Sequence, residues 1–159
     1  MRTVIRALRE EETPLLRDFL YEAVFVPEGA DPPPREIVEK PELRVYTDGF
    51  GSREGDCCLV AECGGKVAGA VWTRIMRDYG HVDDGTPSFA ISVLEEYRGQ
   101  GIGSRLLEEM LGVLKRRGYR EASLAVQKAN YAVRMYRKAG FETIRETAEE
   151  YIMVRRLEG

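Results

Sequence analysis

The chain is poor in the residue types from which metal centres and disulfide frameworks are built. It has one histidine, His81, and three cysteines, Cys57, Cys58 and Cys63. One histidine and three clustered cysteines do not give the ligand spacing of a tetrahedral metal site, and an odd number of cysteines does not form a closed disulfide framework. We therefore expect no metal, and we expect the cysteines to be small buried residues of a strand.

Long apolar runs and a strong excess of one charge are also missing. No stretch approaches the roughly 20 apolar residues of a transmembrane helix, and the N-terminus leads into charged residues without a signal-peptide core. The formal net charge of −3 disfavours nucleic acid as a partner and is compatible with a cationic amine. We expect a cytoplasmic protein that binds neither membrane nor nucleic acid, and whose residues 1–159 form a single domain.

The most informative stretch is 88–118. It opens with Phe89–Leu94, an apolar run of strand length, and continues into a helical apolar pattern that ends at Gly118. Between them lie three glycines at alternate positions: Gly99, Gly101 and Gly103. A glycine-rich turn between a strand and a helix suits an anion, most often a phosphate, because the backbone can approach the ligand and the first free N–H groups of the helix point at it. The alternative is a tight loop that only turns the chain.

Two common phosphate-binding motifs fit this loop poorly. A Rossmann fingerprint needs its third glycine at the position of Ser104, and its acidic residue would be Glu121, which opens the next apolar run instead of closing it. A P-loop needs a lysine directly after its last glycine, whereas Gly103 is followed by Ser104 and Arg105.

The remaining chain reads as a regular succession of strands and helices around one irregular insert. The expected elements are a strand over 3–8, a helix with Thr13 as N-cap and Pro14 as first residue through 25, an insert over 27–56 with short helical turns at 35–39 and 42–46, a hairpin of 57–63 and 66–76 around Gly64-Gly65, a turn over 78–85, a strand at 89–94, a helix from 102 to Gly118, a strand at 119–126, a helix over 131–139 capped by Asn130, and strands at 141–145 and 151–155. A strand–helix–strand unit over 91–126 implies one parallel pair in an otherwise antiparallel sheet, so the fold class is mixed α/β (α+β).

Two motifs occur in this context in a fixed order. The first is Arg98-x-x-Gly101-x-Gly103 after Ser-Val-Leu-Glu-Glu-Tyr, and the second is Asn130-x-Ala132-x-x-x-Tyr136-x-x-x-Gly140-Phe141. Together they resemble the GCN5-related N-acetyltransferases, the GNAT family, over nearly the whole chain and least within 27–56. The resemblance implies the acyl-CoA N-acyltransferase fold: a mixed, mostly antiparallel central sheet of about seven strands with helices on both faces.

The resemblance also implies an activity and a set of site residues. The activity is transfer of acetyl from acetyl-CoA, the cosubstrate, to a primary amine by direct attack in a ternary complex. The matching positions for coenzyme binding are Ile91, Ser92 and Val93 for the pantetheine arm, Arg98, Gly99, Gln100, Gly101, Ile102, Gly103 and Ser104 for the pyrophosphate, and Asn130 and Tyr136. A backbone N–H near Val93 is the expected donor to the acyl oxygen. Tyr136 matches the general acid that protonates the leaving thiolate, and its alternative is a packing tyrosine.

The residue that takes the proton from the amine is left open by the sequence. Glu95 and Glu96 in the turn after the strand are the candidates closest to the glycine loop, and Asp83, Asp84 and His81 are further ones. Each has an alternative as a solvated turn or surface residue, and bulk water is an alternative base.

Two readings of function follow. The first is an acetyl-CoA-dependent N-acetyltransferase acting on a small-molecule or peptide amine. The second is a non-catalytic acyl-CoA-binding regulatory or sensor module, which would keep the glycine loop without turnover. In the resembling family the insert forms one wall of the acceptor site, and a homodimer is expected by analogy alone.

Overall fold

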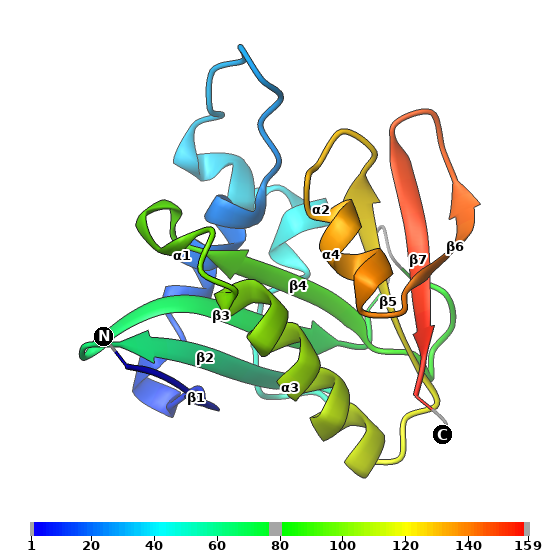
Figure 1. Ribbon diagram of the computed structural model, residues 1–159, viewed down its shortest axis with the longest axis horizontal. Coiled ribbons are helices and arrows are strands. Elements are labelled where there is room, and N and C mark those ends of the chain that lie inside the picture. The colour runs from blue at the N-terminus through cyan, green and yellow to red at the C-terminus, as the bar shows by residue number, and fades with distance from the viewer. Residues whose placement is uncertain (1, 77–80, 158–159) are drawn as a thin grey trace.

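A computed structural model describes residues 2–76 and 81–157 (Figure 1). Residues 77–80, which include the start of the turn predicted over 78–85, lie outside the described residues. The elements are β1 (Thr3–Ala7), η1 (Glu10–Glu12), α1 (Leu15–Ala23), η2 (Arg35–Glu39), α2 (Pro41–Arg44), β2 (Cys57–Cys63), β3 (Lys66–Arg74), β4 (Ser88–Val93), η3 (Glu95–Tyr97), α3 (Ile102–Arg116), β5 (Glu121–Gln127), α4 (Val133–Lys138), β6 (Glu142–Glu146) and β7 (Glu150–Arg156).

The strands form one seven-stranded sheet in the order β1-β2-β3-β4-β5-β7-β6. All neighbours are antiparallel except β4 and β5, which are parallel. Helices α3 and α4 lie on one face of this sheet, and α1 and α2 lie on the other (Figure 1). The predicted fold class, a mixed and mostly antiparallel sheet of seven strands with helices on both faces, is confirmed.

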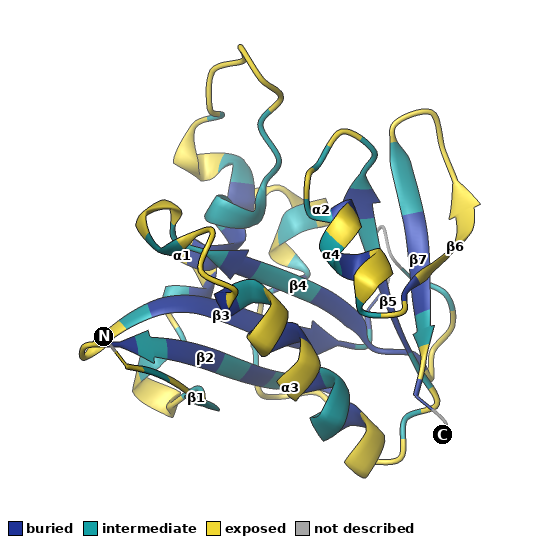
Figure 2. Ribbon diagram, in the orientation of Figure 1, coloured by how far each residue is buried: buried dark blue, intermediate teal, exposed yellow. Residues whose placement is uncertain are grey.

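Each sheet face carries its own apolar core. On one face α3 repeats its apolar residues every four positions, which places Leu106, Met110 and Leu114 on one stripe where all three are fully buried (Figure 2). On the other face α1 packs Phe19 and Leu20 against a core that contains Trp72 of β3. Burying one such aliphatic side chain contributes roughly 1.5–3 kcal/mol. The two cores hold the sheet rigid between the helical layers.

Two helices begin later than the sequence predicted. Thr13 does not cap α1, because a 3-10 turn precedes the helix and the Thr13 hydroxyl donates to the carbonyl of Glu10 at 2.7 Å. α1 starts at Leu15 and ends at Ala23, since Val24 has extended backbone angles. α4 starts at Val133, after a turn that Asn130 closes.

Candidate functional site

The two parallel strands in the middle of the sheet separate after a single point of contact. β4 and β5 pair only at Ser88 and Ser123, and beyond that point their ends diverge (Figure 1). On its other edge β4 stays paired with β3 along its full length, and Leu94 N–H still donates to the Ala68 carbonyl at 2.8 Å. Backbone groups alternate in direction along a strand. Val93 and Ile91 lie one and three residues before Leu94, so their N–H and C=O groups point the opposite way, toward the gap.

Ser92 is oriented differently from its two neighbours. It lies two residues before Leu94, whose N–H donates to the Ala68 carbonyl of β3, so its backbone N–H and C=O groups also point toward β3. Its hydroxyl is the one buried side-chain oxygen or nitrogen among residues 2–76 and 81–157 that has no hydrogen-bond partner. Of the three β4 residues predicted for the pantetheine arm, the structure thus brings the backbones of Ile91 and Val93 to the gap.

The glycine loop lies at the open end of the gap and begins α3. Gly99 and Gly101 have φ values of +78° and +79°, a region that L-residues with a Cβ rarely adopt. An added Cβ at either position would meet no atom within 4 Å, so conformation and not crowding requires glycine. Gly103 differs, because an added Cβ there would lie 3.3 Å from the sulfur of Met135 in α4.

The first turn of α3 has the features of an anion site. No side chain caps it and it holds no acidic residue. The first amide bonded within the helix is that of Arg105, which donates to the Gly101 carbonyl. The N–H groups of Ile102, Gly103 and Ser104 therefore have no partner within the helix and carry the positive end of its dipole.

The side chain of Arg98 ties the loop to β4. Its Nε donates to the Val93 carbonyl at 2.8 Å, and its Nη2 lies 3.8 Å from a carboxylate oxygen of Glu22 in α1. Gln100, between the glycines, is exposed. The loop thus leaves its backbone amides, and not the Arg98 Nε, free for a ligand, and Arg98 ties the loop to β4.

Tyr136 is buried in the core under α3 and α4. It belongs to the same cluster as Val126 of β5, and the partly buried Ile91 and Val93 pack against that cluster. Its ring meets Phe141 edge to face at 5.9 Å. Burial raises the pKa of the phenol above its ordinary value, so the hydroxyl keeps its proton at neutral pH. Tyr136 thus belongs to the core on one face of the two strands that form the gap, and Phe141 links its ring to Phe89 of β4.

Asn130 closes the turn that leads into α4. Its Oδ1 accepts a hydrogen bond from the Ala132 amide at 2.8 Å. The side chain therefore shapes the chain between β5 and Tyr136. Its coenzyme contact stays a prediction.

The predicted proton acceptors lie in separate places. Glu95 and Glu96 are exposed, and Glu96 pairs with Lys66 at 3.1 Å, a hydrogen bond that lowers the pKa of its carboxyl. His81 Nδ1 donates to the Met76 carbonyl, 2.8 Å away, and the His81 carbonyl accepts from Arg145 of the edge strand β6. A base role for either glutamate stays a prediction.

The two aspartates that precede β4 are turn residues. An Asp83 carboxylate oxygen accepts from Gly85 N–H at 2.8 Å and from the Thr86 hydroxyl at 2.9 Å. Asp84 lies 3.5 Å from His81 Nε2 and is largely exposed. In the described parts of the chain, none of the five predicted proton acceptors is hydrogen-bonded to Tyr136.

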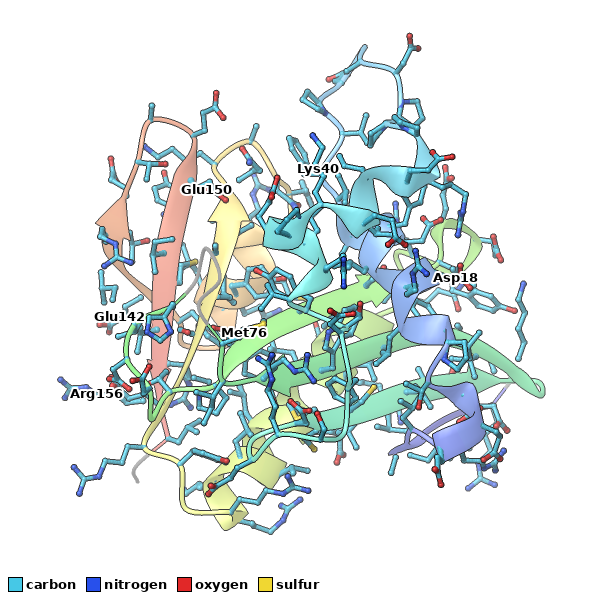
Figure 3. All side chains as sticks on the ribbon, turned by 180° about the vertical axis from the view of Figure 1, so that it is seen from behind. Asp18, Lys40, Met76, Glu142, Glu150 and Arg156 are labelled. Carbon is cyan, nitrogen blue, oxygen red and sulfur yellow. The ribbon has the colours of Figure 1, made fainter. Side chains whose placement is uncertain are left out.

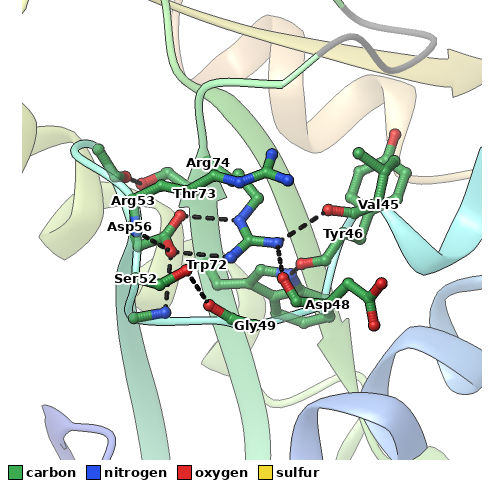
Figure 4. Close-up of polar contacts among 12 residues, drawn as sticks. Val45, Tyr46, Asp48, Gly49, Ser52, Arg53, Asp56, Trp72, Thr73 and Arg74 are labelled. Carbon is green, nitrogen blue, oxygen red and sulfur yellow. Dashed lines mark hydrogen bonds and ion pairs between the residues drawn. The ribbon is translucent and has the colours of Figure 1, made fainter.

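The insert is held by an ion pair that the sequence analysis missed (Figure 4). Arg74 of β3 and Asp56 have side-chain exposures of 0% and 1%, and they form two parallel hydrogen bonds of 2.8 and 2.9 Å. Arg74 also donates to the carbonyls of Val45 and Asp48. Trp72, two residues before it, donates to the Tyr46 carbonyl at 3.1 Å. Side chains of β3 thus fix the segment that follows α2.

Asp56 completes this arrangement, which we call the Arg74–Asp56 clamp. Burial alone would raise the pKa of its carboxyl, but hydrogen bonds from Arg74 and from the amides of Gly51 and Arg53 outweigh burial and lower it. The carboxylate therefore stays ionised. The signal in the sequence was a lone arginine at the end of the apolar run 67–73, since a buried charge needs a partner.

Comparison with known proteins identifies the family. The model of the Acetyltransferase (GNAT) family matches residues 18–141, which is more than half of the chain. The chain belongs to the GNAT acetyltransferase family, as its two motifs predicted.

Relatives of known name are acetyltransferases. An uncharacterized N-acetyltransferase of Archaeoglobus fulgidus is 31% identical over 104 residues, 61% of this chain and 67% of that protein. N-acetyltransferase 8 of Mus musculus is 31% identical over 112 residues, 70% of this chain and 48% of that protein. Mycothiol acetyltransferase of Thermobifida fusca is 33% identical over 93 residues, 56% of this chain and 29% of that protein. The match spans less than half of the last two relatives.

Solved structures share the fold. The PaiA N-acetyltransferase of Thermoplasma acidophilum, in complex with coenzyme A, superposes with a TM-score of 0.73 at 20% identity, covering 98% of this chain and 99% of that one. A GNAT acetyltransferase of Streptococcus pneumoniae gives 0.71 at 23% identity, covering 99% and 100%. Within residues 2–76 and 81–157 no helix has the length and hydrophobicity to span a bilayer, and no three potential metal ligands gather.

Proposed function

We propose that the protein transfers acetyl from acetyl-CoA to a primary amine in a ternary complex. One observation carries this proposal: β4 and β5 separate after Ser88 and Ser123, and the glycine loop begins α3 at the open end of their gap. The gap offers the Val93 N–H and the N–H and C=O groups of Ile91 to an extended amide-containing arm, while the Val93 carbonyl accepts from Arg98. The first turn of α3 offers three free amides to a pyrophosphate.

Each part of the coenzyme is bound by a different set of backbone groups. The free amides of Ile102, Gly103 and Ser104 hold the pyrophosphate, and the backbone of Ile91 and Val93 binds the pantetheine arm along β4. A backbone N–H near Val93 donates to the acyl oxygen as charge develops on it. The amine nitrogen forms its bond to the acyl carbon while the carbon–sulfur bond breaks.

Tyr136 then supplies the proton that the departing thiolate takes up. Its buried phenol is protonated at neutral pH, which is the state required of a general acid. The attacking amine releases its own proton to solvent or to a carboxylate. The reaction is therefore balanced in protons, since the neutral amine loses one proton and the thiolate gains one.

Release of free thiol from acetyl-CoA, followed across a panel of primary amines, tests the activity. We expect at least one amine to accelerate thiol release, and we expect Tyr136→Phe to lower kcat by roughly 10²-fold or more with little change in acetyl-CoA affinity. Full kcat in Tyr136→Phe across pH would refute the acid role. Acetyl-CoA binding without thiol release for any amine would favour the sensor reading.

A further inference from the structure

The face of the sheet opposite Tyr136 carries a carboxylate at the mouth of the gap. Glu150 opens β7 and pairs directly with Gln127, the last residue of β5. Directly paired residues share a face, and neighbours along a strand alternate. Tyr151 and Met153 pack in the core with Tyr136. Glu150 and Gln127 therefore lie on the other face of the sheet, the one on which α1 and α2 lie (Figure 3).

The Glu150 carboxylate is half-buried and has no partner in the part of the chain that the structure describes. Among residues 2–76 and 81–157, no cation lies within 4 Å of it and no donor is hydrogen-bonded to it. Burial, and then the nearby charge of Glu149, raise the pKa of its carboxyl. By contrast, the similarly sheltered Glu12 pairs with Arg6 at 2.8 Å.

The cations around Glu150 have other partners. Arg145 of β6 pairs with Ile152 and so shares the face of Glu150, but its Nη2 donates to the His81 carbonyl at 3.3 Å. Two further cations lie on the opposite face. Lys128 pairs with Glu146 at 3.1 Å and lies over the ring of Tyr151 at 5.3 Å. Arg137 of α4 lies over the same ring at 5.1 Å. Since Tyr151 belongs to the face of Tyr136, these charges do not neutralise Glu150.

A carboxylate that is partly removed from water and lacks a counter-charge favours a cation from outside the chain. Resting on the proposed acetyl transfer, we propose that Glu150 binds a second positively charged group of the amine acceptor, so that the preferred acceptors are di- or polyamines. The reacting nitrogen must be neutral to attack, so the charge that Glu150 binds is a different one. β7 is the second strand from the gap, and strands lie about 4.8 Å apart, a spacing that a short aliphatic diamine can bridge.

Two amines of equal chain length test the proposal. Butylamine has one amino group and 1,4-diaminobutane has two, and calorimetry measures the binding of each to the protein saturated with coenzyme A. We expect 1,4-diaminobutane to bind about tenfold tighter or more, as one charge-assisted hydrogen bond allows. Glu150→Gln should abolish that preference. Glu149→Gln, a neighbouring change at an exposed carboxylate, should preserve it.

The outcomes separate this proposal from the proposed function. Equal or undetectable binding of the two amines by the wild type, or an unchanged preference in Glu150→Gln, would overturn the role of Glu150. Acetyl-CoA is titrated separately into the same proteins free of coenzyme A. Its normal binding in such a case leaves the acetyltransferase assignment standing, whereas loss of acetyl-CoA binding in the wild type would remove both.

Discussion

Replacement of Asp56 by Asn tests whether the Arg74–Asp56 clamp holds the insert. The substitution keeps the shape of the side chain but removes its charge, so the fully buried Arg74 guanidinium loses its counter-ion. Removing one partner of a buried ion pair costs about 3–5 kcal/mol, because the other charge stays buried and unpaired. Against a total stability of about 5–15 kcal/mol, this is a large fraction.

Urea and thermal unfolding, followed by circular dichroism, measure this loss. For a chain of this size each kcal/mol lowers Tm by about 2–4 °C, so we expect Asp56→Asn to lower Tm by roughly 6–20 °C. Asp18→Asn is the matched control, because Asp18 pairs with Arg35 at 2.6 Å with both side chains mostly exposed. Such a pair contributes about 0–1 kcal/mol.

The clamp also has a pH signature with a definite sign. Because the pKa of Asp56 is lowered in the folded protein, its stabilisation is present above the pKa of the unfolded chain and is lost as pH falls through the folded pKa. The difference in stability between wild type and Asp56→Asn should therefore shrink in acid. A loss no larger than that of Asp18→Asn at pH 7 would refute the reasoning.

Two further predictions concern the loop and the acid stability. Gly101→Val forces a β-branched residue to a φ of +79° and should weaken acetyl-CoA binding, measured by calorimetry, at least tenfold. The control Gly29→Val, at a φ of +82° in the insert, should leave the affinity unchanged. Equal affinities in both variants would contradict the loop assignment. The hydrogen bond from Arg6 lowers the pKa of the Glu12 carboxyl from 4.5 to about 2. The wild type should therefore be more stable than Glu12→Gln above about pH 4.5, and this difference should vanish as pH falls toward 2. A constant difference down to pH 2 in acid titrations would argue against this pairing.

Turns and helices were predictable because they depend on residues that are close together in the sequence. Gly64 and Gly65 both have positive φ, the requirement of a type I′ two-residue hairpin turn. The antiparallel pairing of β2 with β3 on either side of them confirmed the predicted hairpin. The four-residue apolar repeat of α3 and the stop at Gly118 likewise predicted a helix that ends within two residues of the observed end. Short-range periodicity carries this information.

The features that depend on distant residues were harder to predict. The single β4–β5 contact at Ser88 and Ser123 joins positions 35 residues apart, and the apolar pattern of a strand does not say where pairing stops. The clamp joins Arg74 to Asp56 and to carbonyls of the insert. A repeating pattern of apolar residues does not predict such a contact. Glu150 reads as an ordinary strand-start acid until the β5–β7 register assigns its face.

Calorimetric titration of the purified protein with acetyl-CoA tests the central claim most directly, with NAD and ATP as controls. The account predicts one binding site per chain with micromolar affinity for acetyl-CoA and no response to either control, because the gap between β4 and β5 accepts a pantetheine arm that these nucleotides lack. Absence of acetyl-CoA binding by the folded protein, or equal binding of ATP, would contradict the assignment of the gap and the glycine loop.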